Sequence, residues 1–85
     1  MNKGSVRFED AQGLLYQIFW NGEHEAFCDE RQDDGSIARH PINTIDVRSV
    51  HVVPVNRAQA ARYFAWSLAY HLPQAHPDVS VHAYN

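Results

Sequence analysis

The segment of residues 57–72 constrains the fold more than any other part of the chain. Asn56 precedes it and Gln59 follows three residues later, a spacing typical of a capping box at the start of a helix. The alanine-rich composition that follows favours a helix. Pro73 and Pro77 lack the amide hydrogen that a helix interior needs, so we expect the helix to end near residue 72, about 24 Å from its start.

This predicted helix is apolar on two opposite sides. A helical wheel places on one broad stripe Ala58, Ala61, Phe64, Ala65, Leu68, Ala69 and Leu72. The opposite side carries Tyr63, Trp66 and Tyr70. One sheet can cover only one of these sides. The other is either covered by the loop of residues 37–48, or it forms a contact surface rich in the residue types found at interface hot spots.

Several short segments around the helix predict strands. Residues 5–9 alternate between polar and apolar side chains, and residues 14–20 are rich in aromatic and branched ones. Residues 37–47 show no clean period and predict irregular structure with room for one short strand. Residues 50–55 are largely β-branched, and residues 79–84 alternate again. The predicted order is a strand, a hairpin, one or two strands, the helix and a final strand.

The dipeptide Asn21-Gly22 is the strongest local turn signal, because both residues tolerate the positive φ angles of a two-residue hairpin turn. With such a turn, Phe19 faces His24 across the hairpin and Leu15 faces Cys28. We therefore expect Phe27 on the same side of the sheet as Tyr16 and Trp20.

Together these elements predict an α+β fold in one domain spanning residues 1–85. Its sheet is antiparallel or mixed, with four to five strands, and the helix of residues 57–72 packs on one face. A chain of 85 residues has a small core, so each large apolar side chain matters for its stability.

Composition excludes several classes of function. The net charge is −3 and the lysines and arginines are scattered, which argues against a nucleic-acid partner. No apolar run is long enough to span a membrane, and the first five residues do not resemble a signal peptide. Cys28 is the only cysteine, so no internal disulfide can form. We expect a small soluble cytoplasmic protein without a membrane partner.

Histidines and the cysteine offer the only candidates for chemistry. His24 and Cys28 would lie about 13 Å apart on one strand, too far to share a metal ion. His51 and His82 fall on two predicted strands and could approach each other, and His24 or His51 could serve Cys28 as a base. Because no motif supports these arrangements, we predict no enzyme activity, no metal site and no cofactor.

These observations favour a protein-interaction module that acts as a homodimer, adaptor or inhibitor. Its predicted anchors are Tyr63, Trp66 and Tyr70, and its predicted acidic region, expected at one end of the molecule, includes Glu23, Glu25, Asp33 and Asp34. The alternative is a small-ligand-binding domain with a pocket between helix and sheet. The residues predicted to line that pocket are Tyr16, Trp20, Phe27 and Phe64.

Overall fold

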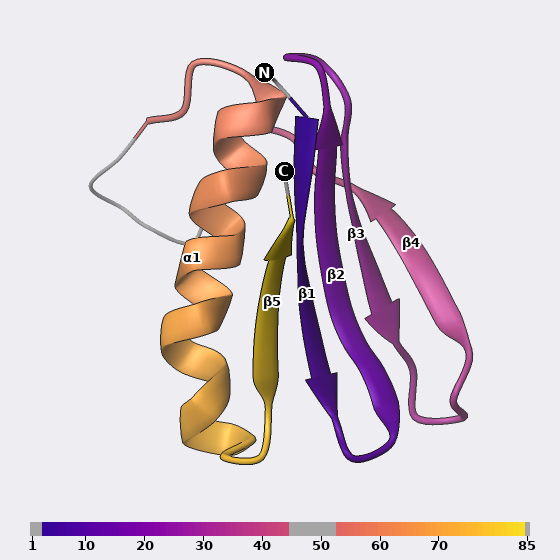
Figure 1. Cartoon of the computed structure of the whole chain (residues 1–85). Helices are drawn as coiled ribbons and strands as arrows, with labels where there is room; N and C mark the ends of the chain where they lie inside the picture. Colours follow the sequence, from indigo (N-terminus) through magenta and orange to yellow (C-terminus); the bar gives the residue numbers. More distant parts are fainter. Residues whose placement is uncertain (1–2, 45–52, 85) are drawn as a thin grey trace.

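The computed structural model describes residues 3–44 and 53–84, which form a five-stranded antiparallel sheet with one helix packed on it (Figure 1). The elements in chain order are β1 (Lys3–Asp10), β2 (Gly13–Asn21), β3 (Ala26–Arg31), β4 (Ile37–Pro41), α1 (Arg57–Ala75) and β5 (Ser80–Tyr84). This arrangement confirms the predicted α+β fold.

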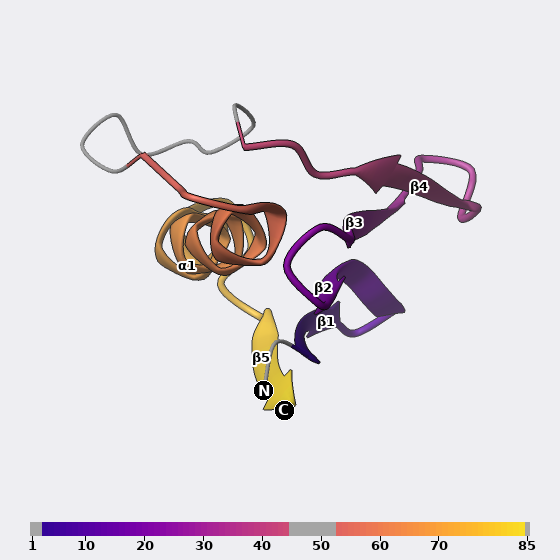
Figure 2. The same ribbon diagram turned by 90° about the horizontal axis from the view of Figure 1, so that it is seen from above.

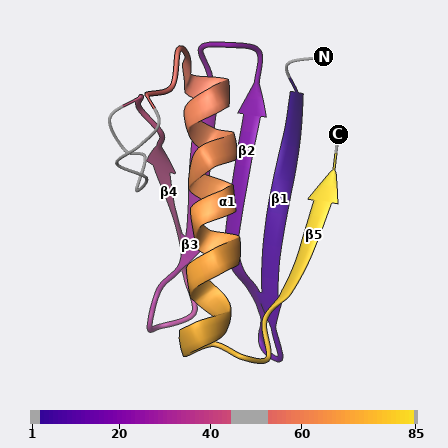
Figure 3. The same ribbon diagram turned by 90° about the vertical axis from the view of Figure 1, so that its left-hand side faces the viewer.

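The first four strands form a meander, and the helix then brings the last strand to the other edge of the sheet. The strand order is β4-β3-β2-β1-β5, and every neighbouring pair is antiparallel. Ser5 of β1 is paired with Tyr84 of β5. Figure 3 shows α1 crossing in front of β2 and β3, and Figure 2 shows it on one side only of the twisted sheet. The opposite side of the sheet is not covered by any described element.

The register of the β2–β3 hairpin differs from the predicted one. Phe19 is paired with Phe27, and Ile18 with Cys28, whereas the prediction paired Phe19 with His24. A type I′ turn would need positive φ angles at both Asn21 and Gly22, but only Gly22 has one, at 74°. The connection is a longer loop, so β3 slips by three residues relative to the prediction.

A contact with the helix accounts for this longer loop. The backbone carbonyl of Glu23 accepts hydrogen bonds from the amides of Arg57 and Ala58, at 2.9 and 3.3 Å. These amides belong to the first turn of α1 and have no partner within the helix. The slip also directs Ala26 and Cys28 toward the buried side of the sheet. The β2–β3 connection is therefore longer than a two-residue turn, and its Glu23 carbonyl caps the first turn of α1.

The start of α1 follows the predicted capping pattern. The side-chain oxygen of Asn56 accepts a hydrogen bond from the amide of Gln59, at 2.8 Å. The side chain of Gln59 in turn accepts one from the amide of Val55, also at 2.8 Å. This second bond explains why residues 53–55, predicted to end a strand, lie outside any strand: the Val55 amide serves the helix. Residues 50–52 of that predicted strand lie outside the described residues.

The end of α1 lies beyond the predicted one. The helix includes Pro73 and continues to Ala75, whereas we expected it to end near residue 72. Proline removes one helical hydrogen bond, but the amide of His76 still donates to the carbonyl of Leu72 at 2.7 Å and closes the last turn. A proline this close to the C-terminal end is therefore accommodated.

The core lies between α1 and the covered face of the sheet. The fully buried side chains of Phe8 and Ile18 form its centre on the sheet side. The residues that α1 buries are Ala58, Ala60, Ala61, Ala65, Leu68 and Leu72. Ala60 was not on the predicted stripe, while Phe64 and Ala69 of that stripe are only partly buried. The small alanine side chains let the helix backbone approach the strands closely.

Candidate functional site

The outer side of α1 exposes large aromatic side chains. Trp66 is 76% exposed and Tyr70 is 71% exposed, while Tyr63 is partly buried. Residues three and four positions apart on a helix lie on one face, so the three rings form one surface, which we call the aromatic helix face. The ring of Tyr70 also contacts that of His71 edge-on, with centroids 5.0 Å apart. The structure thus brings the three predicted anchor residues together.

The charges on α1 are all positive. The helix contains Arg57 and Arg62 and no acidic residue, and its last turn has no basic one. Arg57 donates a hydrogen bond to the carbonyl of His24 at 3.1 Å. The Arg62 guanidinium lies over the Trp20 ring, 5.9 Å from its centroid, and so leans toward the sheet. The N-terminal half of the helix therefore contains both arginines, and its C-terminal half contains no lysine, arginine, aspartate or glutamate.

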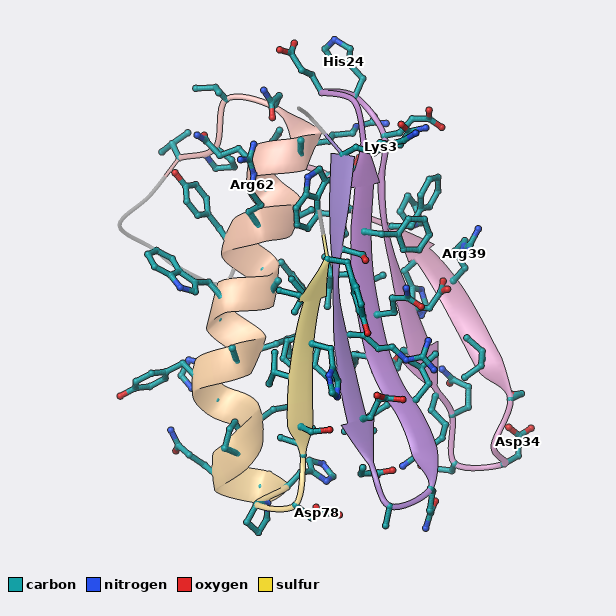
Figure 4. The ribbon with its side chains drawn as sticks, in the orientation of Figure 1. Lys3, His24, Asp34, Arg39, Arg62 and Asp78 are labelled. Atoms are coloured by element: carbon teal, nitrogen blue, oxygen red, sulfur yellow. The ribbon has the colours of Figure 1, made fainter. Side chains whose placement is uncertain are left out.

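The predicted acidic residues do not gather at one end of the molecule. Glu23 and Glu25 lie in the β2–β3 loop, whereas Asp33 and Asp34 lie in the β3–β4 turn. The six residues of β3 separate the two groups by roughly 20 Å. Figure 4 shows the separation, with His24 of the first loop at the top and Asp34 at the bottom. A single acidic region spanning all four residues was therefore a wrong expectation.

Asp34 also has a local structural role. Its side chain accepts hydrogen bonds from the hydroxyl and the amide of Ser36, at 2.6 and 2.9 Å. These bonds favour the ionised form and lower the pKa of the Asp34 carboxyl. The residue stabilises the β3–β4 turn in the way typical of aspartate at turn positions.

The four residues predicted to line a pocket between helix and sheet separate into two groups. Tyr16 of β2 and Phe64 of α1 line an open cavity of about 430 Å³, together with residues of β3 and β4. Trp20 is 8% exposed and belongs to the core, and Phe27 lies on the uncovered face of the sheet. We call the cavity that Tyr16 and Phe64 line the β3–β4 cavity. Its other lining residues are Cys28, Glu30, His40, Pro41 and Ile42.

Among the described residues that line the β3–β4 cavity, Glu30 is the only acidic one and none is lysine or arginine. The hydroxyl of Tyr16 donates a 2.9 Å hydrogen bond to Oε2 of Glu30. The other oxygen, Oε1, lies 3.7 Å from Nε2 of His40 and 3.5 Å from Nε2 of Gln32. One oxygen of the carboxylate is thus held firmly and the other only by long contacts.

The uncovered face of the sheet carries a second feature that sequence reasoning missed. The rings of Phe19 and Phe27 pair across β2 and β3 with centroids 5.5 Å apart. The Arg39 guanidinium lies 4.8 Å from the Phe19 centroid and binds both carboxylate oxygens of Asp29, at 2.8 and 3.1 Å (Figure 4). These hydrogen bonds raise the pKa of Arg39. The correct hairpin register would have revealed this cluster, because it places the two phenylalanines opposite each other.

Of the two histidines considered as a base for Cys28, only His24 lies within the described residues. Cys28 is buried and is paired across β3 and β4 with His40, a residue that we did not single out. His24 lies in the β2–β3 loop, His82 lies 3.2 Å from Glu9 on the β5 side, and His51 lies outside the described residues. Within residues 3–44 and 53–84, no three His, Cys, Asp or Glu side chains are arranged to hold a metal ion. In these same ranges, no helix combines the length and apolarity needed to cross a membrane.

Comparison with known proteins does not add a family to this picture. No protein-family model, no curated protein and no solved structure matched the chain. Its function must therefore be inferred from the geometry of its own residues.

Proposed function

We propose that this protein is a protein-interaction module that pairs with a second copy of itself through the aromatic helix face. The observation that supports this proposal is the exposure of Trp66 and Tyr70, at 76% and 71%, one helical turn apart. Single exposed aromatic residues are ordinary on protein surfaces, but adjacent ones of these types are enriched at interface hot spots.

The exposed area is consistent with a pair of copies. A buried Trp or Tyr side chain accounts for about 150–250 Å², so Trp66 and Tyr70 together offer roughly 300 Å² per copy. Two copies would bury roughly 600 Å² from these rings alone, against a typical total of about 1,600 Å² for a stable interface. The flanking residues of the helix would supply the rest.

The charges of α1 favour an antiparallel pairing of the two helices. Trp66 is the central residue of α1, so a twofold axis beside it places Tyr63 against Tyr70 of the second copy, and the reverse. In this arrangement Arg57, at the start of α1, approaches the C-terminal end of the second helix. The free carbonyls there carry partial negative charge, and the last turn has no basic residue that would repel Arg57. The acidic loops at the two ends of β3 take no part in this contact.

Sedimentation equilibrium across a concentration series tests the proposal. We expect the wild type to dimerise and Trp66→Ser to weaken the dimer by at least about thirtyfold, the effect of losing roughly 2 kcal/mol at a hot spot. The matched control is Val81→Ser, which removes another exposed apolar side chain, on β5. It should leave dimerisation unchanged, and both variants should keep the wild-type circular dichroism spectrum.

Two results would overturn the proposal. A wild type that stays monomeric up to about 1 mM would exclude any useful self-association. A Trp66→Ser variant that dimerises as well as the wild type would place the contact elsewhere on the surface.

A second candidate function is small-ligand binding in the β3–β4 cavity. The specific observation in its favour is a cavity of about 430 Å³ between helix and sheet, lined by Tyr16 and Phe64. This volume lies within the range of about 300–1,000 Å³ that is usual for ligand pockets. This candidate does not compete with self-association, because the aromatic helix face does not line the cavity.

A further inference from the structure

We propose that the β3–β4 cavity binds a small organic cation, of the class of alkylated ammonium ions. This inference rests on the second candidate function above, that the cavity is a ligand site, and it assigns the chemistry of the ligand. Three properties of the lining residues support it: their charge, the nature of their apolar surface, and the long contacts of one carboxylate oxygen of Glu30.

The charge of the lining selects for a cation. Among the lining residues that the structure describes, Glu30 is the only acidic side chain, none is lysine or arginine, and the one imidazole, that of His40, lies 3.7 Å from the Glu30 carboxylate. The whole chain also carries a net charge of −3, which adds to the attraction. An anion entering the cavity would meet a like charge at close range, whereas a cation would be stabilised by it.

The apolar surface suits an organic cation better than a metal ion. Tyr16 and Phe64 contribute aromatic rings, and Ile42 and Pro41 contribute aliphatic surface. Aromatic ring faces attract cations through their quadrupole, and cages of such rings are a common way to bind alkylated ammonium groups. Among the described residues, the side chains of this cavity do not form a group of metal ligands. The alkyl groups of an organic cation would instead contact the apolar wall.

The carboxylate of Glu30 is oriented for this role. The hydrogen bond from the Tyr16 hydroxyl to Oε2, at 2.9 Å, fixes the side chain in one direction. Within the described part of the chain, Oε1 has only the long contacts to Gln32 and His40, at 3.5 and 3.7 Å, and the Glu30 side chain is 37% exposed. A strong charge-assisted contact would be shorter than these. Oε1 is therefore the atom that the cation would approach.

The test is an NMR titration of the ¹⁵N-labelled full chain with choline and with its uncharged carbon isostere, dimethylbutanol. These probes have the same shape and differ in charge. We expect choline to shift the amide resonances of residues around the cavity and to bind at least about tenfold more tightly than dimethylbutanol. Glu30→Gln, which keeps an acceptor for Tyr16, should reduce the choline affinity to that of the alcohol. Amide-resonance dispersion will verify that this variant is folded.

The matched control is Glu25→Gln, which removes the same charge from the exposed β2–β3 loop and should change the choline affinity by less than about twofold. A second variant, Phe64→Leu, retains an apolar wall without the ring and should weaken choline several-fold while leaving dimethylbutanol unaffected. If both probes bind equally well, the cation is the wrong ligand class but the cavity remains a ligand site. If neither probe shifts the cavity resonances, the ligand site itself is overturned together with the cation. Choline binding that survives Glu30→Gln unchanged would exclude the carboxylate as the recognition group.

Discussion

Replacing Gly4 by alanine should destabilise the protein through a steric conflict at the β1–β5 end of the sheet. A Cβ atom at this position would lie 2.7 Å from Cζ2 and 3.1 Å from Cε2 of Trp20. It would also lie 3.0 Å from the backbone carbonyl oxygen of Tyr84 in β5. Favourable contacts between carbon atoms are about 3.5–4.0 Å, so either the indole or β5 must move.

Two opposing terms set the size of this effect. Overpacking of a filled core usually costs about 1–3 kcal/mol, and Trp20 is only 8% exposed and so has little room to shift. Gly4 does not have a positive φ angle, so alanine would gain about 0.5–1 kcal/mol by restricting the unfolded chain. We therefore expect Gly4→Ala to lower the free energy of unfolding by about 1–2 kcal/mol, or the melting temperature by roughly 10 °C.

Urea denaturation followed by far-ultraviolet circular dichroism measures this change, and a double-mutant cycle with Trp20→Phe identifies its cause. Phenylalanine lacks the part of the indole that Cβ would strike. If the indole is responsible, Gly4→Ala should cost at least about 1 kcal/mol less in the Trp20→Phe background. Equal costs in the two backgrounds would assign the conflict to the carbonyl of Tyr84. A Gly4→Ala variant as stable as the wild type would refute the reasoning altogether.

Three further predictions concern stability. The Arg31 guanidinium, hydrogen-bonded to Asp10, lowers the pKa of that carboxyl from 3.8 to about 2, so its stabilisation is present above pH 3.8 and is lost as the pH falls through 2. Asp10→Asn should therefore lower the urea midpoint at pH 6 and shrink the difference in midpoint between pH 6 and pH 2; an unchanged difference would assign the acid sensitivity elsewhere. Asn56→Ala removes the cap of α1 and should cost about 1 kcal/mol in urea denaturation, with Asn56→Asp as the tolerated control. Ile18→Ala empties a fully buried position and should cost about 2–5 kcal/mol by the same measurement, and a cost below about 1 kcal/mol would contradict its central place in the core.

The sequence signals that succeeded were local. The Asn56 and Gln59 pair marks the start of α1 because a capping box is complete within four residues. The wheel correctly separated the buried Ala58, Ala61 and Ala65 from the exposed Trp66 and Tyr70, because the helical period relates neighbours on one face. Alternation similarly located the first and last strands.

The error in the hairpin register came from one contact that the sequence does not encode locally. The longer β2–β3 loop allows the carbonyl of Glu23 to accept a hydrogen bond from the amide of Arg57 at the start of α1. These two residues are more than thirty positions apart in the sequence. Because side chains alternate along a strand, the resulting slip by an odd number of residues moves Phe27 from the predicted pocket to the uncovered face. The same slip pairs Cys28 with Ile18, whereas the predicted register paired it with Leu15. Cys28 thereby becomes one of the residues that line the β3–β4 cavity. Of the four residues predicted to line a pocket between helix and sheet, Tyr16 and Phe64 line the β3–β4 cavity, and Trp20 and Phe27 do not.

The pairing of β1 with β5 has a kinetic consequence for the whole molecule. The two partners Ser5 and Tyr84 are almost a full chain length apart, so this ladder can form only after the entropy of closing a very long loop has been overcome. β5 also has a single neighbouring strand, and its side chains are all exposed. It should therefore dock last during folding and detach first in native-state fluctuations, which makes its amides the fastest to exchange hydrogen within the sheet.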